Sequence, residues 1–92
     1  MTQREPELLG QTVVVIGGSA GIGLETARRA RGEGAEVVLT ARDPKRLERA
    51  ALDVEARSTA AFDATDAAAL KRFFDELPAP IDHVLVTGPG PS

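Results

Sequence analysis

The sequence predicts an α/β fold with a parallel sheet and the element order β-α-β-α-β-α-β. Short runs of apolar and β-branched residues alternate with longer stretches whose apolar side chains recur at helical spacing. The most apolar run shows no polar alternation, as expected of a strand buried on both faces of a parallel sheet. Strands that alternate with helices imply right-handed crossovers between parallel neighbours. The 92 residues are enough for one small domain.

The first strand and the first helix carry the strongest signals. A strand is predicted at residues 12–16, Thr-Val-Val-Val-Ile, followed by a glycine-rich turn. A helix is predicted from about Gly21 to Glu33. Small side chains recur along one of its faces and let it lie close to a sheet: Gly23, Ala27, Ala30 and Gly34. The arginines of its other face are typical of a solvated helix surface.

The second strand and helix follow at once. Residues 36–41 form the strand, and Asp43 with Pro44 marks a helix start, with Asp as the N-cap and Pro in the first helical position. The buried stripe predicted for this helix is Leu47, Ala51 and Val54.

The last elements are a weak strand, a helix and a fourth strand. The weak strand is predicted at residues 59–62 and the fourth at residues 82–87. Between them, Thr65 or Asp66 caps a helix whose apolar face keeps 3.6-residue spacing: Leu70, Phe73, Phe74 and Leu77.

We expect the strand order 3-2-1-4, which is half of a doubly wound sheet, with residues 1–11 as a lead-in. The first two helices then cover one face and the third helix covers the other face alone. The fourth strand is left as an unpaired apolar edge. We therefore expect the chain to pair with a missing C-terminal half or with another copy of itself.

Composition excludes several classes of function. There is no cysteine, and His83 is the only histidine, so neither a disulfide framework nor a metal site is expected. Trp and Tyr are absent and the net charge is −3, so we expect no nucleic-acid partner. No apolar run is long enough to span a membrane and the N-terminus is polar, so we expect no membrane contact and a cytoplasmic location.

The glycine-rich turn between the first strand and the first helix is the main candidate site. Gly17 permits a tight turn, Gly21 lets the backbone approach a phosphate, and Gly23 lets the helix pack on the strand. The helix N-terminus would offer free N–H groups to a pyrophosphate. No lysine follows Gly21 or Gly23, which excludes a phosphate-loop NTPase. The alternative to nucleotide binding is a purely structural turn.

The spacing from Gly17 to Gly23, with Ser19 and Ile22 inside it, resembles the T-G-x-x-x-G-[IL]-G motif of the short-chain dehydrogenase/reductase family. Ile16 stands where that family usually has Thr. The resemblance implies a Rossmann-type dinucleotide-binding half-domain over residues 12–92. It implies a dinucleotide cofactor held by Gly17, Ser19, Gly21, Ile22 and Gly23.

The second and third strands extend the resemblance to the adenosine end of the cofactor. Members that use NAD(H) tend to carry an acid at the position of Ala41; here Arg42 follows instead, and a guanidinium can grip a 2′-phosphate. The resemblance therefore implies a preference for NADP(H) over NAD(H). Asp63 resembles the family residue that accepts a hydrogen bond from the adenine amino group. The alternatives are a solvated arginine and a carboxylate that only begins a loop.

The end of the chain departs from the family pattern. Thr87, Gly88 and Pro89 stand where the family has Asn-Asn-Ala, so the contacts of those asparagines with the sheet and the ribose are replaced here. We include Thr87 and Gly88 among the cofactor-binding residues.

No catalytic residue is assigned. The family uses a Ser and a Tyr-x-x-x-Lys pair, and this chain contains no Tyr. The sequence thus predicts the NADP(H)-binding portion of an oxidoreductase that transfers hydride between nicotinamide and a carbonyl or alcohol. The alternatives are a non-catalytic module that binds NADP(H) or another adenine nucleotide and an S-adenosylmethionine-binding domain. The last of these would require an acid where Ala41 and Arg42 stand.

Overall fold

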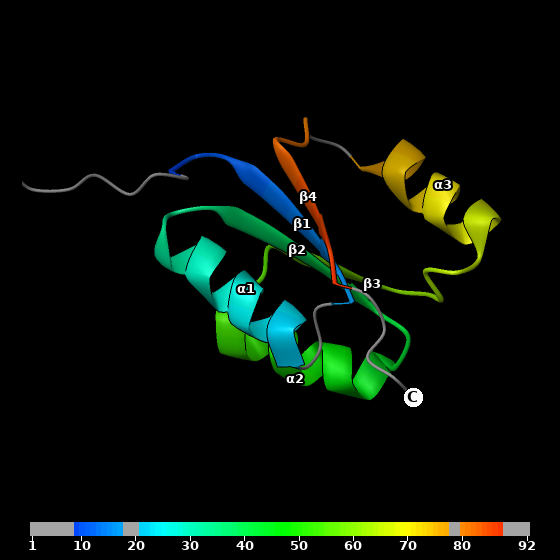
Figure 1. Cartoon of the computed structure of the whole chain (residues 1–92), viewed down its shortest axis with the longest axis horizontal. Helices are drawn as coiled ribbons and strands as arrows, with labels where there is room; N and C mark the ends of the chain where they lie inside the picture. The colour runs from blue at the N-terminus through cyan, green and yellow to red at the C-terminus, as the bar shows by residue number, and fades with distance from the viewer. Residues whose placement is uncertain (1–8, 18–20, 78–79, 88–92) are drawn as a thin grey trace, which may run out of the picture.

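The computed structural model describes residues 9–17, 21–77 and 80–87, and Figure 1 shows their arrangement. The described elements are β1 (Thr12–Ile16), α1 (Gly21–Gly32), β2 (Glu36–Ala41), α2 (Pro44–Val54), β3 (Ser58–Ala61), α3 (Ala67–Glu76) and β4 (His83–Val86). The predicted order of elements is confirmed.

The four strands form one parallel sheet in the order β3-β2-β1-β4, so the predicted strand order 3-2-1-4 is also confirmed. In the register of β1 with β4, Val14 lies beside Val84 and Ile16 beside Val86. Helices α1 and α2 lie on one face of the sheet, and α3 lies on the other (Figure 1). This arrangement is half of a doubly wound fold.

The face under α1 and α2 holds the main core. Val13 and Val15 of β1 and Leu39 of β2 are at most 1% exposed there, because two helices cover them. From α1, the small residues Gly23, Ala27 and Ala30 are buried against the sheet, as their spacing predicted. The absence of bulky side chains on this stripe lets the helix approach the strands closely.

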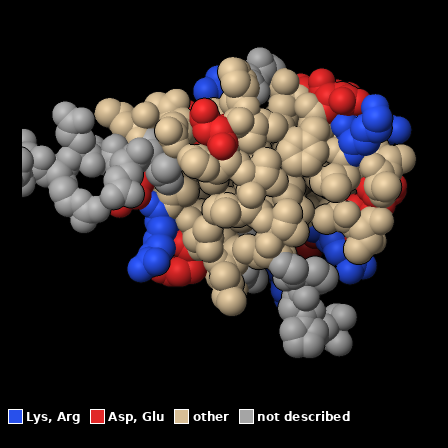
Figure 2. Space-filling view, turned by 45° about the horizontal axis from the view of Figure 1, so that its top comes forward, with Lys and Arg blue, Asp and Glu red and all other residues tan. Residues whose placement is uncertain are grey.

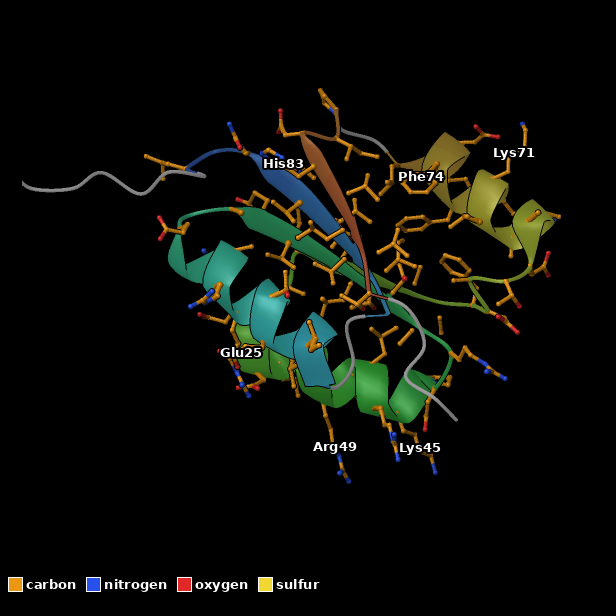
Figure 3. All side chains as sticks on the ribbon, viewed as in Figure 1. Glu25, Lys45, Arg49, Lys71, Phe74 and His83 are labelled. Carbon is orange, nitrogen blue, oxygen red and sulfur yellow. The ribbon has the colours of Figure 1, made fainter. Side chains whose placement is uncertain are left out.

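The α3 face is thinner. Val14, Ile16 and Val38 are buried beneath Phe73, Phe74 and their neighbours, but no side chain of α3 is itself fully buried. Figure 3 shows Phe74 directed from α3 toward the sheet. Because one helix cannot cover four strands, Val84 and Val86 remain 44% and 71% exposed.

Local signals set the helix starts. Asp43 caps α2 by accepting from the N–H groups of Lys45 and Arg46, and Pro44 begins the helix. Asp66, rather than Thr65, caps α3 by accepting from two backbone N–H groups. A side-chain acceptor at an N-cap satisfies N–H groups that have no partner within the helix.

Several predicted details need correction. Ala50, and not Ala51, joins Leu47 and Val54 in the buried stripe of α2, and Ala51 is only half-buried. Positions three and four residues after Leu47 both lie near the same helix face, so spacing alone does not choose between them. Other differences lie at element ends: α1 ends one residue earlier, α3 ends at Glu76 just before Leu77, β3 begins and ends one residue earlier, and β4 is one residue shorter at each end. Gly34, predicted in the small-residue stripe of α1, lies beyond the helix and is half-buried.

Candidate functional site

The carboxyl ends of the four strands meet at one edge of the sheet. There β1 leads toward α1 on one face, while its neighbour β4 receives the chain from α3 on the other face. In open parallel sheets this switch point is where ligands bind. The predicted site residues Gly17 and Thr87 lie at this point, immediately after β1 and β4.

Gly17 occupies a conformation and a space that exclude a side chain. Its φ is +87°, in the left-handed region. A Cβ placed on it would lie 2.7 Å from the backbone oxygen of Thr87 and 3.0 Å from that residue's hydroxyl oxygen. The turn after β1 therefore passes directly against the end of β4.

The first turn of α1 carries no acidic residue. Gly21 has a φ of +61°, and a Cβ there would meet nothing within 4 Å. Ile22 is 79% exposed, and Gly23 is buried against the sheet. An open helix start without negative charge suits an anion, because its first N–H groups have no partners in the helix. Ser19 and Gly88 lie outside the described residues.

Arg42 and Asp63 come together at the ends of β2 and β3. The Nε of Arg42 lies 3.9 Å from the Oδ2 of Asp63, and the Arg42 side chain is 74% exposed. The Oδ1 of Asp63 accepts from the backbone N–H and the hydroxyl of Thr65, at 2.9 and 2.7 Å. These hydrogen bonds, with a smaller contribution from the charge of Arg42, lower the pKa of Asp63. A cation and an ionised carboxylate thus stand side by side at the edge of the crevice.

Three contacts were missed by sequence reasoning. The hydroxyl of Thr87 donates to the carbonyl oxygens of Ile16 and Gly17, at 2.9 and 3.1 Å. His83, for which the sequence suggested no partner, places its Nε2 2.7 Å from the Oε1 of Gln11. The third contact is the pairing of Arg42 with Asp63. The predicted strand order places the strands concerned side by side, but nothing in the sequence indicates their register.

A separate cavity of about 260 Å³ lies between α1 and β4, lined by Val13, Thr26, Arg29, Ala30, Glu33, His83 and Leu85. Its residues come from β1, β4, α1 and the residue that follows α1, and none of them is a predicted site residue, so the cavity is distinct from the crevice at the strands' carboxyl ends.

None of the helices that the structure describes could span a membrane.

A sequence model of short chain dehydrogenases matches residues 11–89, which span all seven elements and the crevice. The chain belongs to the short-chain dehydrogenase family. This is a family of oxidoreductases that bind nicotinamide dinucleotides. The resemblance carried by Gly17, Gly21 and Gly23 is therefore confirmed at the level of the family.

Curated relatives are much longer than this chain. The fatty acyl-CoA reductase of Acinetobacter baylyi is 35% identical over 79 residues, which cover 82% of this chain and 27% of that protein. The short-chain dehydrogenase/reductase ATR9 of Stachybotrys chlorohalonatus is 28% identical over 95 residues, covering 89% of this chain and 38% of ATR9. The chain thus spans about a third of the length of these relatives.

Solved structures share the fold over most of the chain. The citronellol catabolism dehydrogenase AtuB of Pseudomonas aeruginosa PAO1 superposes with a TM-score of 0.82 at 32% identity, covering 89% of this chain and 37% of AtuB. A short chain dehydrogenase from Bacillus anthracis gives 0.79 at 27% identity, covering 87% of this chain and 35% of its own. A relative in fold from Escherichia coli CFT073, at 23% identity and a TM-score of 0.76, was solved in complex with NADPH; it covers 94% of this chain and 40% of its own.

Proposed function

We propose that this chain binds NADP(H) in preference to NAD(H), as the cofactor-binding portion of a short-chain dehydrogenase. The observation that carries the proposal is the position of Arg42 at the end of β2, with no acid at Ala41. A carboxylate there would bind the ribose hydroxyls of NAD(H) and repel a 2′-phosphate. A guanidinium attracts a 2′-phosphate and can form two hydrogen bonds with it.

The geometry around Arg42 supports this role. Its Nε faces Asp63, while its side chain is 74% exposed and thus accessible to a ligand. The fork of a guanidinium carries four further N–H donors beyond Nε. Asp63 would meet the adenine amino group through its carboxylate, which is ionised at neutral pH as an ordinary aspartate is.

The other predicted cofactor-binding residues would hold the pyrophosphate and the inner ribose. Gly17, Gly21 and Gly23 shape the turn and the helix start, and Ile22 is exposed beside them. The proposal also includes Ser19 and Gly88, together with Thr87, which follows β4 directly. When bound, the cofactor would supply the hydride of an oxidoreductase reaction on a carbonyl or alcohol.

Replacing Arg42 tests the proposal. One charge-assisted contact contributes about 1.5–3 kcal/mol, so Arg42→Ala should weaken NADP(H) binding about 10- to 150-fold and leave NAD(H) little changed. Both affinities are measured by isothermal titration calorimetry. Arg49→Ala is the matched control, because Arg49 extends from α2 away from the sheet (Figure 3). An equal loss for both cofactors, or tighter binding of NAD(H) by the unaltered protein, would contradict the proposal.

We also propose that the open edge of β4 is covered by the remainder of the family domain or by a second copy of the chain. β4 pairs only with β1 among the described strands, and Val84, Leu85 and Val86 are all exposed. Figure 2 shows this side of the molecule as a largely uncharged surface with most Lys, Arg, Asp and Glu side chains near its margins. The greater length of the relatives supports the remainder of the family domain as the part that covers this edge.

A further inference from the structure

The residue after β1 is held from both neighbouring strands. The Gly17 N–H donates to the Thr40 carbonyl oxygen of β2 at 2.9 Å. On the other side, the Gly17 carbonyl accepts from the Thr87 hydroxyl at 3.1 Å. Gly17 lies outside β1, which ends at Ile16. The two bonds therefore extend cross-strand bonding by one residue into the glycine-rich turn.

The Thr87 hydroxyl has only one proton, and it is shared between two backbone carbonyls, those of Ile16 and Gly17. The Ile16 carbonyl has a second donor, the Thr87 backbone N–H at 3.1 Å. The Gly17 carbonyl has no other donor among the contacts of the described residues. Without the hydroxyl, the Gly17 carbonyl would lose this donor, whereas the Ile16 carbonyl would keep the Thr87 N–H that pairs β1 with β4.

Space as well as hydrogen bonding couples the two residues. The Thr87 backbone oxygen lies only 2.7 Å from the position of a Cβ on Gly17, so Gly17 packs against the end of β4 without space for a side chain. Gly17 begins the turn that leads to the open start of α1 at Gly21. A change in the direction of the Gly17 carbonyl would alter the path of the backbone that faces a phosphate.

We propose that Thr87 is a positioning residue: its hydroxyl clamps the Gly17 carbonyl and so presets the glycine-rich turn for the pyrophosphate. This deepens the proposed function and rests on it for the ligand. It assigns Thr87 a role through Gly17, in addition to its proposed place among the cofactor-binding residues. The adenosine end of the site, at Arg42 and Asp63, does not depend on this clamp because it lies at the ends of other strands.

The test compares Thr87→Val, which has the same shape without the hydroxyl, with Thr87→Ser, which keeps it. The Gly18 N–H belongs to the same peptide group as the Gly17 carbonyl; in the ligand-free protein we expect its hydrogen exchange to rise about 3- to 10-fold in Thr87→Val and to stay near the unaltered rate in Thr87→Ser. A residue that only touches the cofactor would leave this exchange unchanged. Thr59→Val, at an exposed strand position, is the control for the substitution itself.

Binding of two ligands distinguishes an effect at the pyrophosphate end of the site from an effect at the adenosine end. NADPH contains the pyrophosphate, whereas adenosine 2′-monophosphate lacks it and reports on the adenosine end alone. We expect Thr87→Val to weaken NADPH about 3- to 10-fold, to leave adenosine 2′-monophosphate within twofold, and Thr87→Ser to bind both normally. Equal losses for the two ligands, or unchanged exchange at Gly18, would overturn the proposal.

The exchange measurement needs no ligand, so it shows whether the Thr87 hydroxyl holds the Gly17 carbonyl even if the proposed cofactor is wrong. If the unaltered protein does not bind NADPH, the proposed function fails while a rise in Gly18 exchange in Thr87→Val still supports the clamp. If Thr87→Val does not fold, Thr87→Ala serves in both measurements, since it also lacks the hydroxyl but leaves more room beside Gly17.

Discussion

Replacing Gly17 by alanine should destabilise the fold far more than the same change at two other glycines. Alanine in the left-handed region costs about 1–2 kcal/mol, and Gly17 has a φ of +87°. Its new Cβ would lie 2.7 Å from the Thr87 backbone oxygen, a separation that real Cβ atoms do not show. The strand end cannot retreat freely, because the Thr87 N–H is bonded to the Ile16 carbonyl oxygen. Overpacking of this kind adds about 1–3 kcal/mol.

The two comparison sites separate conformation from crowding. Gly21 has a φ of +61° but open space around a Cβ, so Gly21→Ala should cost only the conformational part, about 1–2 kcal/mol. Gly32 ends α1 with open space and no positive φ, so Gly32→Ala should stabilise the protein by about 0.5 kcal/mol. The expected cost of Gly17→Ala is about 2–5 kcal/mol.

Urea denaturation followed by circular dichroism gives the free energy of unfolding of each variant by linear extrapolation. The expected order of stability is Gly32→Ala, the unaltered protein, Gly21→Ala and Gly17→Ala. If Gly17→Ala is within 0.5 kcal/mol of Gly21→Ala, about half of one net hydrogen bond, the contact with Thr87 has no energetic consequence. That result would refute the crowding of Gly17 against Thr87.

Two further predictions concern Asp63 and the open edge. The folded-state pKa of Asp63 is lowered, so its stabilising contacts are present above the ordinary value of about 3.9 and are lost as the pH falls through the lowered pKa. Thr65→Val should move the Asp63 titration, measured by carboxyl NMR, back toward the ordinary value; an unchanged titration would exclude the Thr65 hydroxyl as its main cause. At the edge, Val86→Lys should abolish self-association seen by sedimentation, whereas Leu52→Lys, at an equally exposed position on α2, should not. A compact monomer without concentration dependence in the unaltered chain would contradict the pairing of copies.

Much of the fold could be predicted because its signals are local. The β-branched run at residues 12–16 can be buried on both faces only in a parallel sheet, and the small residues of α1 match a helix that lies close to that sheet. Asp43 and Asp66 start their helices by hydrogen bonds to N–H groups two and three residues ahead. Such interactions depend on neighbours in the chain, which the sequence displays directly.

The ends of elements and the choice of Ala50 over Ala51 depended on packing. Neighbouring positions on a helix have nearly the same propensity, so the sheet beneath α2 decides which of them is buried. Similarly, β3 and β4 are four residues each because their pairing partners in β2 and β1 determine where cross-strand bonding ends.

The sequence by itself predicted the family, the strand order and the places of Gly17 and Thr87 after the first and fourth strands, because a glycine spacing and an alternation of elements are readable along the chain. Only the tertiary structure brought Arg42 beside Asp63 and placed the Thr87 hydroxyl on the Gly17 carbonyl, 70 residues away. Each of these contacts joins the ends of different strands in the parallel sheet. Their geometry depends on the register and twist of strands that adjoin in space, and no local pattern of residues encodes a distance between side chains so far apart in the chain.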